Sequence, residues 1–483
     1  MDMGAITPPA GYDGARYVEE TAEAVEAKES QIMPRLFGTD GVRGLANRDL
    51  TARLALDLGD AAVRVLGNSA VREGLPEGRR RALIGRDTRV SGDFLASALC
   101  AGMSAGGFDV IDAGIIPTPG VAFLTSVLNV EMGAVISASH NPMPDNGIKF
   151  FSGEGTKLPD AVELGIEDEL DAGCTCVPSA ELGKARRLDD AAGRYIEFCK
   201  STIDFSTDLK GLRILVDCAN GAAYHIAPDV FHELGAEVVA VGNTPDGLNI
   251  NDGVGATHTE NLSRLAAEHG CDVAVSLDGD ADRLIMADAE GHVYNGDELL
   301  YVIVRDRMLQ GPVAGVVGTL MTNYALERRF GELGVSFVRA KVGDRYVLEE
   351  LKRNGWLFGG ESSGHILALD RQTTGDGIVS ALQVLSAMRR SGRSLAELTA
   401  DLQLLPQVLV NKRIPAGYDW QNDRDFSRTV EACRTEVEGR GRVLIRPSGT
   451  EPLLRIMVEA DDAYLAAELT SRMAESLSVE HQA

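Results

Sequence analysis

Three aspartates at alternating positions are the strongest chemical signal in the chain. Asp278, Asp280 and Asp282 stand in the stretch Asp278-Gly-Asp-Ala-Asp-Arg283, directly after the apolar run 272–277. In an extended segment alternate side chains point to one side, so we predict that the three carboxylates converge on one cation. An all-oxygen ligand set with open positions suits Mg²⁺. The alternative is a solvated acidic turn, which rarely follows an apolar run so tightly.

A second signal is a serine beside a histidine, in the stretch Ser137-Ala-Ser139-His140-Asn141-Pro142. A hydrolase is one interpretation and an ordinary turn is another. Adjacent residues of an extended loop point apart, which places His140 poorly as a base for Ser139, and the Gly-x-Ser-x-Gly elbow is absent. A loop serine used together with a metal site suits phosphoryl transfer better, with the serine carrying the phosphoryl group.

Two further loops combine glycine with polar side chains. Gly359-Gly-Glu361-Ser-Ser363-Gly-His365 offers a carboxylate, hydroxyls and an imidazole, which suit sugar hydroxyls, although a tight turn uses the same residues. Arg446-Pro-Ser448-Gly449-Thr450-Glu-Pro452, with Arg455 beyond it, can cradle a phosphate. The alternative is a proline-bounded turn. Because the net charge is −25, an anionic substrate needs local positive potential, which favours the phosphate interpretation.

The elements that must position these loops alternate between short apolar runs and helical stretches. The apolar runs 82–85, 133–136, 213–216, 272–277 and 313–317 are typical of buried parallel strands. Stretches such as 50–66 and 160–172 are long enough for crossover helices, so we predict an α/β architecture. The polar clusters follow the strands, at the sheet edge where open parallel sheets bind ligands.

The chain divides into four predicted domains after a short extension. Residues 1–32 are expected to carry no chemistry. The predicted domains are 33–190 with the Ser139 loop, 191–291 with the metal loop, 292–403 with the sugar-binding loop and 404–483 with the phosphate-binding loop. The last domain is predicted to be a small α+β domain with two strand pairs and a terminal helix.

Composition excludes several classes of protein. The 72 acidic residues against 47 basic ones argue against a nucleic-acid or anionic-membrane surface. The sequence has no apolar stretch near the ~18 residues of a membrane span, and its start has no signal-peptide core. The seven dispersed cysteines predict reduced thiols in the cytoplasm.

The four loops, in this order, resemble the α-D-phosphohexomutase superfamily over nearly all of 33–475. The segments Phe37-Gly-Thr-Asp-Gly-Val-Arg-Gly44, Pro245-Asp-Gly-Leu-Asn-Ile-Asn251 and Val342-Gly-Asp-Arg-Tyr-Val347 are most similar to bacterial members that act on glucosamine phosphates. The resemblance implies four domains around a central cleft. Three are similar α/β units with mixed sheets, and the fourth is a smaller C-terminal α+β domain.

The resemblance also implies roles for individual residues. Ser139 is the phosphoserine, and one of its oxygens with Asp278, Asp280 and Asp282 holds one Mg²⁺ per chain. The resemblance implies catalytic roles for Arg43, His140 and Lys149. It leaves open whether Arg43, Lys149 or His365 moves the proton. The implied sugar-binding residues are Arg283, Glu361, Ser363 and His365. The implied phosphate-binding residues are Arg446, Ser448, Gly449, Thr450 and Arg455.

The implied activity interconverts glucosamine 6-phosphate and glucosamine 1-phosphate through a 1,6-bisphosphate that turns end for end in the cleft. This serves the synthesis of UDP-N-acetylglucosamine and the cell wall. A hexose 1,6-bisphosphate is the expected activator, a kinase or autophosphorylation supplies the first phosphoserine, and a homodimer is a candidate assembly. The alternatives are a mutase for glucose or mannose phosphates, a phosphatase, and a catalytically silent sugar-phosphate sensor.

Overall fold

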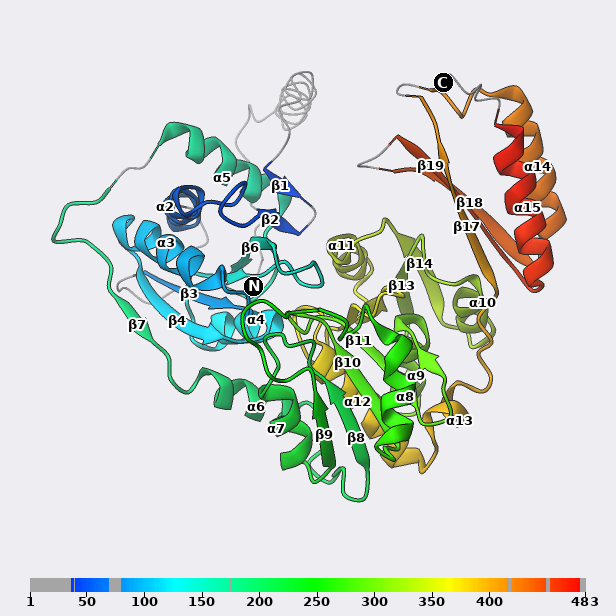
Figure 1. Cartoon of the computed structure of the whole chain (residues 1–483), viewed down its shortest axis with the longest axis horizontal. Helices are drawn as coiled ribbons and strands as arrows, with labels where there is room; N and C mark the ends of the chain where they lie inside the picture. Colours follow the sequence, from blue (N-terminus) through cyan, green and yellow to red (C-terminus); the bar gives the residue numbers. More distant parts are fainter. Residues whose placement is uncertain are drawn as a thin grey trace, which may run out of the picture.

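The computed structural model describes residues 36–38, 40–68, 80–173, 176–415, 418–448 and 452–477. They form four sheets, and the domains built on them follow one another in an arc, with the first and fourth at its two ends (Figure 1). The expected extension 1–32 lies outside the described residues.

The first domain is built on a mixed seven-stranded sheet of order β1-β2-β6-β5-β3-β4-β7. Its strands are β1 Phe37–Gly38, β2 Gly41–Leu45, β3 Arg81–Arg86, β4 Asp109–Ile115, β5 Met132–Ile136, β6 Asp145–Ser152 and β7 Ala185–Arg187. Its helices are α2 Ala52–Asn68, α3 Gly92–Ala105, α4 Thr118–Val127 and α5 Asp160–Ala172. Strand β5 pairs parallel with β3 and antiparallel with β6, so the chain reverses directly after β5. The Ser139 loop occupies this reversal.

The second domain is reached through α6 (Ala191–Ser201) and is built on a sheet of order β12-β11-β10-β8-β9. Its strands are β8 Arg213–Asp217, β9 Glu237–Val241, β10 Val273–Leu277, β11 Leu284–Asp288 and β12 Val293–Tyr294. Its helical segments are α7 Ile226–Glu233, η2 Thr259–Asn261 and α8 Leu262–Glu268. Strand β10 is buried along its whole length and pairs antiparallel with β11, so the Asp278 loop is the turn between two core strands.

The third domain has a sheet of order β14-β13-β15-β16. Its strands are β13 Gly315–Thr319, β14 Ser336–Ala340, β15 Phe358–Gly360 and β16 Ile366–Ala368. Its helices are α9 Gly296–Met308, α10 Tyr324–Glu332, α11 Asp344–Asn354, α12 Gly377–Ser391 and α13 Leu395–Thr399. The antiparallel pair β15 and β16 leaves residues 361–365 as its turn, and these carry the expected sugar-binding side chains.

The fourth domain is a three-stranded antiparallel sheet of order β17-β19-β18, with helices on one face (Figure 1). Its elements are β17 Gln407–Arg413, α14 Arg424–Val437, β18 Gly441–Pro447, β19 Leu453–Ala460 and α15 Ala463–Ser476. The expected two strand pairs share β19, which hydrogen-bonds to strands on both sides. Helix α14 was missed because only a narrow apolar strip, Phe426, Val430, Cys433 and Val437, marks it.

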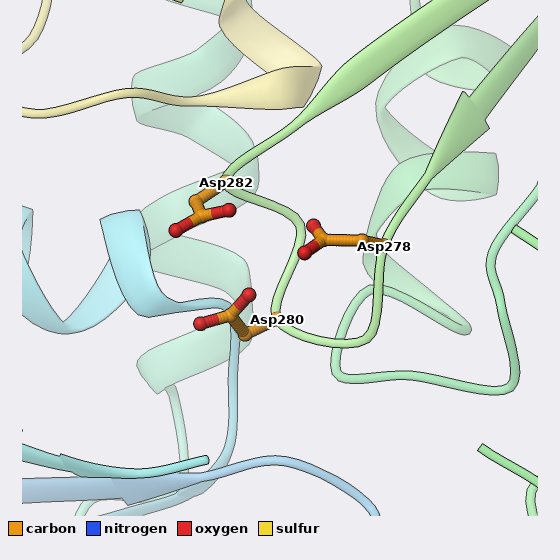
Figure 2. A group of neighbouring side chains, drawn as sticks. All are labelled: Asp278, Asp280 and Asp282. Atoms are coloured by element: carbon orange, nitrogen blue, oxygen red, sulfur yellow. The ribbon is translucent and has the colours of Figure 1, made fainter. Parts of the chain in front are cut away.

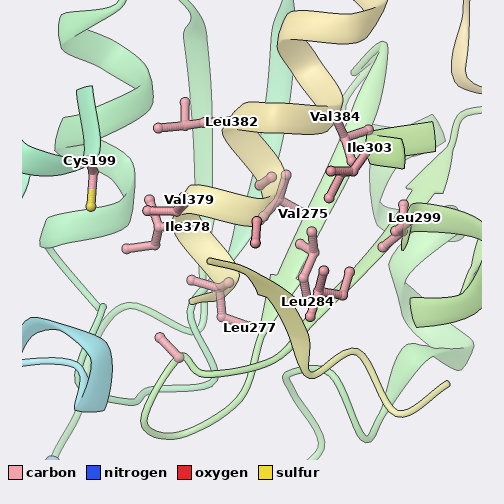
Figure 3. Packing of buried hydrophobic residues seen from close by; sticks show 14 of the residues in the cluster. Cys199, Val275, Leu277, Leu284, Leu299, Ile303, Ile378, Val379, Leu382 and Val384 are labelled. Atoms are coloured by element: carbon pink, nitrogen blue, oxygen red, sulfur yellow. The ribbon is translucent and has the colours of Figure 1, made fainter. Parts of the chain in front are cut away.

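One hydrophobic core joins the first three domains. It includes Leu83 of the first sheet, Val275 of the second and Val316 of the third. Helix α12, buried over almost its whole length, lies where these layers meet, and Figure 3 shows its side chains together with those of β10, β11, α9 and α6. The fourth domain has its own core between its sheet, α14 and α15.

The expected strands near residues 82, 133, 213, 272 and 313 and the helices near 50–66 and 160–172 are all present. The α/β architecture with mixed sheets is therefore confirmed. Among the described residues, no helix combines the length and apolar character needed to cross a membrane.

Candidate active site

Ser139 lies directly after β5 in a strained backbone conformation. Its φ of +52° is in the left-handed region, which non-glycine residues rarely adopt and which clusters at functional sites. The buried Ser139 hydroxyl donates to Asp278 Oδ2 at 2.6 Å, and its backbone N–H donates to Ser137 Oγ at 2.9 Å. The loop is not extended, so the argument that adjacent side chains point apart was wrong. His140 Nδ1 lies 3.3 Å from Ser139 Oγ.

Arg89 supports this strained turn from behind. Its buried guanidinium pairs with Asp87 at 2.9 Å and donates to the carbonyls of Ser139 (3.1 Å) and Asn141 (2.8 Å). Asn251 of the second domain adds a hydrogen bond of 2.9 Å to the same Ser139 carbonyl. The segments that contain Arg89 and Asn251 stood out in the sequence, but neither residue was given this role. The polar cluster that follows β3 was the available signal for Arg89.

The three aspartates converge as predicted. Oxygens of Asp278, Asp280 and Asp282 all lie within 4.8 Å of one another, and the three buried side chains point toward a common centre (Figure 2). The segment is a tight turn rather than an extended strand, because Ala281 N–H donates to the Asp278 carbonyl at 3.0 Å and Ala281 has a φ of +59°.

The bonding of the cluster fits a metal ion. The Oδ1 atoms of Asp280 and Asp282 are buried without a hydrogen-bond partner in the described chain, which is costly for a carboxylate unless a cation satisfies it. Burial, with the charges of Asp282 and Asp280, raises the pKa of Asp278 well above its usual value. A divalent cation would relieve this repulsion, and hard oxygen ligands are those that Mg²⁺ prefers.

Lys149 brings positive charge to the same cluster from β6. Its buried ammonium lies 3.0 Å from Asp280 Oδ2 and 2.8 Å from Asp40 Oδ2. Burial alone would lower the pKa of Lys149, but Asp280 and Asp40 raise it above its usual value, so the side chain is held protonated. Arg43 of β2 pairs with Asp40 and lies 3.4 Å from Asn141 Oδ1. Of the two predicted cations, Lys149 therefore contacts the aspartate cluster directly, and Arg43 is linked to it through Asp40 and Lys149.

Two histidines beside the cluster are shifted in opposite directions. Burial and the charges of Arg283 and Arg43 lower the pKa of His140 to about 4. Burial also opposes a charge on His365, but Asp344 and Asp282 raise its pKa to about 9. The sequence therefore places a neutral imidazole next to Ser139 and a cationic one across from it. Such pairs are suited to separate proton-accepting and proton-donating roles.

The third-domain loop closes the site from the other side. His365 Nδ1 lies 3.6 Å from Asp282 Oδ2, and Arg283 and His365 form a short β-bridge. Glu361 Oε1 accepts the Gly343 N–H at 3.0 Å. These loops surround a hollow of about 560 Å³, large enough for a sugar phosphate. Its lining includes Arg43, Ser139, His140, Asp282, Arg283, Glu361, Ser363 and His365.

The predicted phosphate-binding residues lie apart, on the fourth domain. Arg446 of β18 and Arg455 of β19 are cross-strand partners, so their side chains share one face of the sheet. Burial and the charge of Arg455 lower the pKa of Arg446. Arg455 Nε and Ser448 Oγ are buried donors without a partner among the described residues. Gly449 and Thr450 lie outside the described residues.

Comparison with known proteins supports a single family. Residues 34–174, 193–291 and 295–404 match the α/β/α domains I, II and III of the phosphoglucomutase/phosphomannomutase family. Residues 409–476 match its C-terminal domain. A phosphoglucosamine mutase of Bordetella avium is 59% identical over 445 residues, which cover 92% of this chain and 99% of that protein.

Solved structures agree in fold. A phosphoglucomutase/phosphomannomutase family protein of Burkholderia thailandensis has a TM-score of 0.76 at 24% identity, covering 92% of this chain and 98% of that one. An Aspergillus fumigatus N-acetylphosphoglucosamine mutase in complex with GlcNAc-6P and magnesium has a TM-score of 0.57 at 19% identity, covering 84% of each chain. The chain belongs to the phosphohexomutases of the phosphoglucomutase/phosphomannomutase family and, within them, to the bacterial phosphoglucosamine mutases.

Proposed function

We propose that this protein interconverts glucosamine 6-phosphate and glucosamine 1-phosphate, with Ser139 as the phosphoryl carrier. Its family membership defines the class of reaction. The observation that carries the residue assignment is the Ser139 hydroxyl, buried and 2.6 Å from Asp278 within a converging aspartate cluster. A hydroxyl beside three carboxylates and Lys149 is suited to phosphoryl transfer, where positioning and charge stabilisation supply most of the catalysis.

Asp278, Asp280 and Asp282 would hold one Mg²⁺. The ion would supply positive charge to the transferred phosphoryl group, completing its coordination with a phosphoserine oxygen. The magnesium bound to the Aspergillus neighbour supports this assignment. Lys149 and Arg43 add further positive charge beside Ser139, which would stabilise the charge spread over the phosphoryl oxygens.

The remaining side chains would bind and orient the sugar. Glu361 would accept hydrogen bonds from sugar hydroxyls, and Ser363 would accept or donate them. Arg283 and His365 line the same hollow and would also contact the sugar. His140, neutral beside Ser139, is suited to accept a proton, while protonated Lys149 and His365 are suited to donate one. Arg446, Ser448 and Arg455, with Gly449 and Thr450, would bind the phosphate that does not react.

Two binding sites for phosphate explain how one serine serves both ends of the sugar. Phosphorylated Ser139 transfers its phosphoryl group to the 1-hydroxyl of glucosamine 6-phosphate, giving the 1,6-bisphosphate. The bisphosphate then turns over, and its 6-phosphate returns to Ser139 as glucosamine 1-phosphate leaves. In each orientation the fourth domain would bind the distal phosphate.

The wider setting follows from the same chemistry. A hexose 1,6-bisphosphate would act as activator by phosphorylating Ser139, and a kinase or autophosphorylation would prime it first. The product would feed UDP-N-acetylglucosamine and cell-wall synthesis in the cytoplasm, where scattered free thiols are stable. A homodimer is the proposed assembly.

The test is a side-by-side assay with the 6-phosphates of glucosamine, glucose and mannose, with Mg²⁺ and a trace of hexose 1,6-bisphosphate. We expect a large preference in kcat/KM for glucosamine 6-phosphate. Equal or better turnover of glucose or mannose phosphate would replace the substrate and keep the chemistry. No turnover of any sugar by protein phosphorylated on Ser139 would favour a sensor.

A further inference from the structure

A series of side chains with alternating charge, which we call the charged chain, surrounds the proposed reaction centre. In order of contact it runs through Asp280, Lys149, Asp40, Lys157, Asp344, His365 and Asp282. The successive nitrogen–oxygen distances are 3.0, 2.8, 2.6, 2.5, 3.3 and 3.6 Å. Both ends are members of the aspartate cluster, so the chain closes through the cluster's own loop.

The charged chain has members in all three domains that share the main core. Asp40, Lys149 and Lys157 belong to the first domain, Asp344 and His365 to the third, and the two terminal aspartates to the second. Most of these side chains are buried, so each charge depends on its neighbours in the chain for neutralisation.

Lys157 is the link between the first and third domains in this chain. Its ammonium lies 2.6 Å from Asp40 and 2.5 Å from Asp344, and its side chain is only 10% exposed. On one side Asp40 holds Lys149 and Arg43, and on the other Asp344 lies 3.3 Å from His365. Without Lys157, the two carboxylates would face each other with no cation between them.

We propose that Lys157 is a positioning residue, which holds Lys149 through Asp40 and His365 through Asp344 in their places around the reacting groups. This inference rests on the proposed function. Lys157 lines the hollow, and its side chain is already paired with two carboxylates. We therefore assign its effect to the geometry of its neighbours rather than to chemistry of its own.

The same interface provides a matched control. Arg345, next to Asp344, forms a bidentate pair with Glu163 of α5, both at 2.8 Å, and also contacts Asp160. This pair also joins the first and third domains and is also largely buried, and among the described residues it forms no ion pair with a member of the charged chain, although the charge of Lys157 opposes the rise in the pKa of Glu163. It therefore separates the effect of bridging two domains from the effect of positioning the catalytic cations.

The experiment compares Lys157→Met, Lys157→Arg and Arg345→Met with wild type. It measures kcat and KM for glucosamine 6-phosphate with Mg²⁺ and bisphosphate, and the thermal midpoint of each protein. We expect Lys157→Met to lower kcat by about 10²-fold, as a misplacement of reacting groups by about 1 Å does. We expect Lys157→Arg to recover most of kcat because it restores the charge. Arg345→Met should keep kcat within about threefold.

Equal losses of kcat in Lys157→Met and Arg345→Met would overturn the proposal, because domain bridging alone would then explain them. A Lys157→Met variant as active as wild type would overturn it too. If Lys157→Met does not fold, Asp344→Asn removes the next charge of the charged chain while keeping the shape of the side chain. It should lower kcat similarly. An inactive wild type would instead count against the proposed function.

Discussion

The first three domains and the fourth hold the polar groups of their predicted sites differently. In the first three, the side chains of the site are bound to one another across domain boundaries. Ser139 donates to Asp278, Thr118 donates to Asp280 at 2.7 Å, and Asn251 donates to the Ser139 carbonyl. On the fourth domain, Arg455 Nε and Ser448 Oγ are buried with no partner among the described residues.

The cores differ in the same way. One core runs through the first three domains, whereas the fourth has its own and meets the third at a seam that includes polar contacts. At this seam Glu459 accepts the Tyr324 N–H at 3.0 Å and pairs with Arg442, whose guanidinium donates to the Thr322 carbonyl. The comparison teaches that the predicted reaction centre is linked across three domains, although it too has buried polar atoms without a hydrogen-bond partner, whereas the predicted phosphate-binding residues have no such links among the described residues.

The largest expected effect comes from removing the proposed phosphoryl carrier. Ser139→Ala should lower mutase turnover by at least about 10³-fold, because no other hydroxyl of the site contacts Asp278. Ser137→Ala is the control for loss of a buried hydroxyl in the same loop, since the Ser137 hydroxyl donates to Asp87 and accepts the Ser139 N–H without contacting Asp278 among the described residues. Intact-mass spectra after incubation with glucose 1,6-bisphosphate should show one added phosphoryl group in wild type and none in Ser139→Ala. Substantial turnover by Ser139→Ala would remove the phosphoserine role.

The next effect tests whether the aspartate cluster is a metal site. Asp280→Asn should weaken divalent-cation binding and lower kcat by about 10²- to 10³-fold, because it removes one proposed carboxylate ligand and one of the two carboxylate partners of Lys149. Calorimetric titration with Mn²⁺ measures the binding directly. Asp288→Asn is the control, because Asp288 is buried in the same hairpin and bonds Tyr294 and His292 instead. Chelation by EDTA should abolish wild-type turnover, and added Mg²⁺ should restore it. Full activity of wild type in EDTA would contradict the metal assignment.

A smaller effect is expected on the fourth domain. Arg455→Met should raise the KM for glucosamine 6-phosphate by about 10- to 100-fold, the loss of one charged hydrogen bond to phosphate, and change kcat less. Arg440→Met is the control, since Arg440 pairs with Asp461 on the exposed end of the same sheet. A fall in kcat without a change in KM would mean that Arg455 acts in the reaction centre, and the contrast between the two regions would fail.

The same contrast explains how far the sequence could predict the structure. Buried strands such as β10 and the three aspartates after it could be predicted, because a local pattern of apolar and acidic residues defines both. The supports of the site could not, because Arg89, Asp40 and Lys157 acquire their roles only through partners distant in sequence. The prediction that His140 points away from Ser139 was wrong for a related reason. Hydrogen bonds from Arg89 and Asn251 support the left-handed conformation of Ser139, which a serine does not favour by itself.

The smallest expected effect concerns the seam that carries the fourth domain. Asp297 of α9 is buried there, accepts the Asn323 N–H at 2.8 Å and has one oxygen without a partner in the described chain. Burial, with the charge of Glu459, raises the pKa of Asp297 to about 7. In the unfolded chain the same group titrates near about 3.9. Between these values the folded state keeps a proton that the unfolded state has lost, so the contribution of Asp297 to the free energy of unfolding falls as pH rises from about 4 to 7 and then levels off.

Asp297→Asn has no carboxyl group to titrate and keeps an oxygen that can accept the Asn323 N–H. Its free energy of unfolding should therefore rise relative to that of wild type by about 3 kcal/mol between pH 5 and pH 8, at about 1.4 kcal/mol per pKa unit. Urea unfolding of both proteins at each pH measures this difference, in which the other titrating groups cancel. A constant difference between Asp297→Asn and wild type across this range would mean that the Asp297 carboxyl group is not a source of strain at the seam.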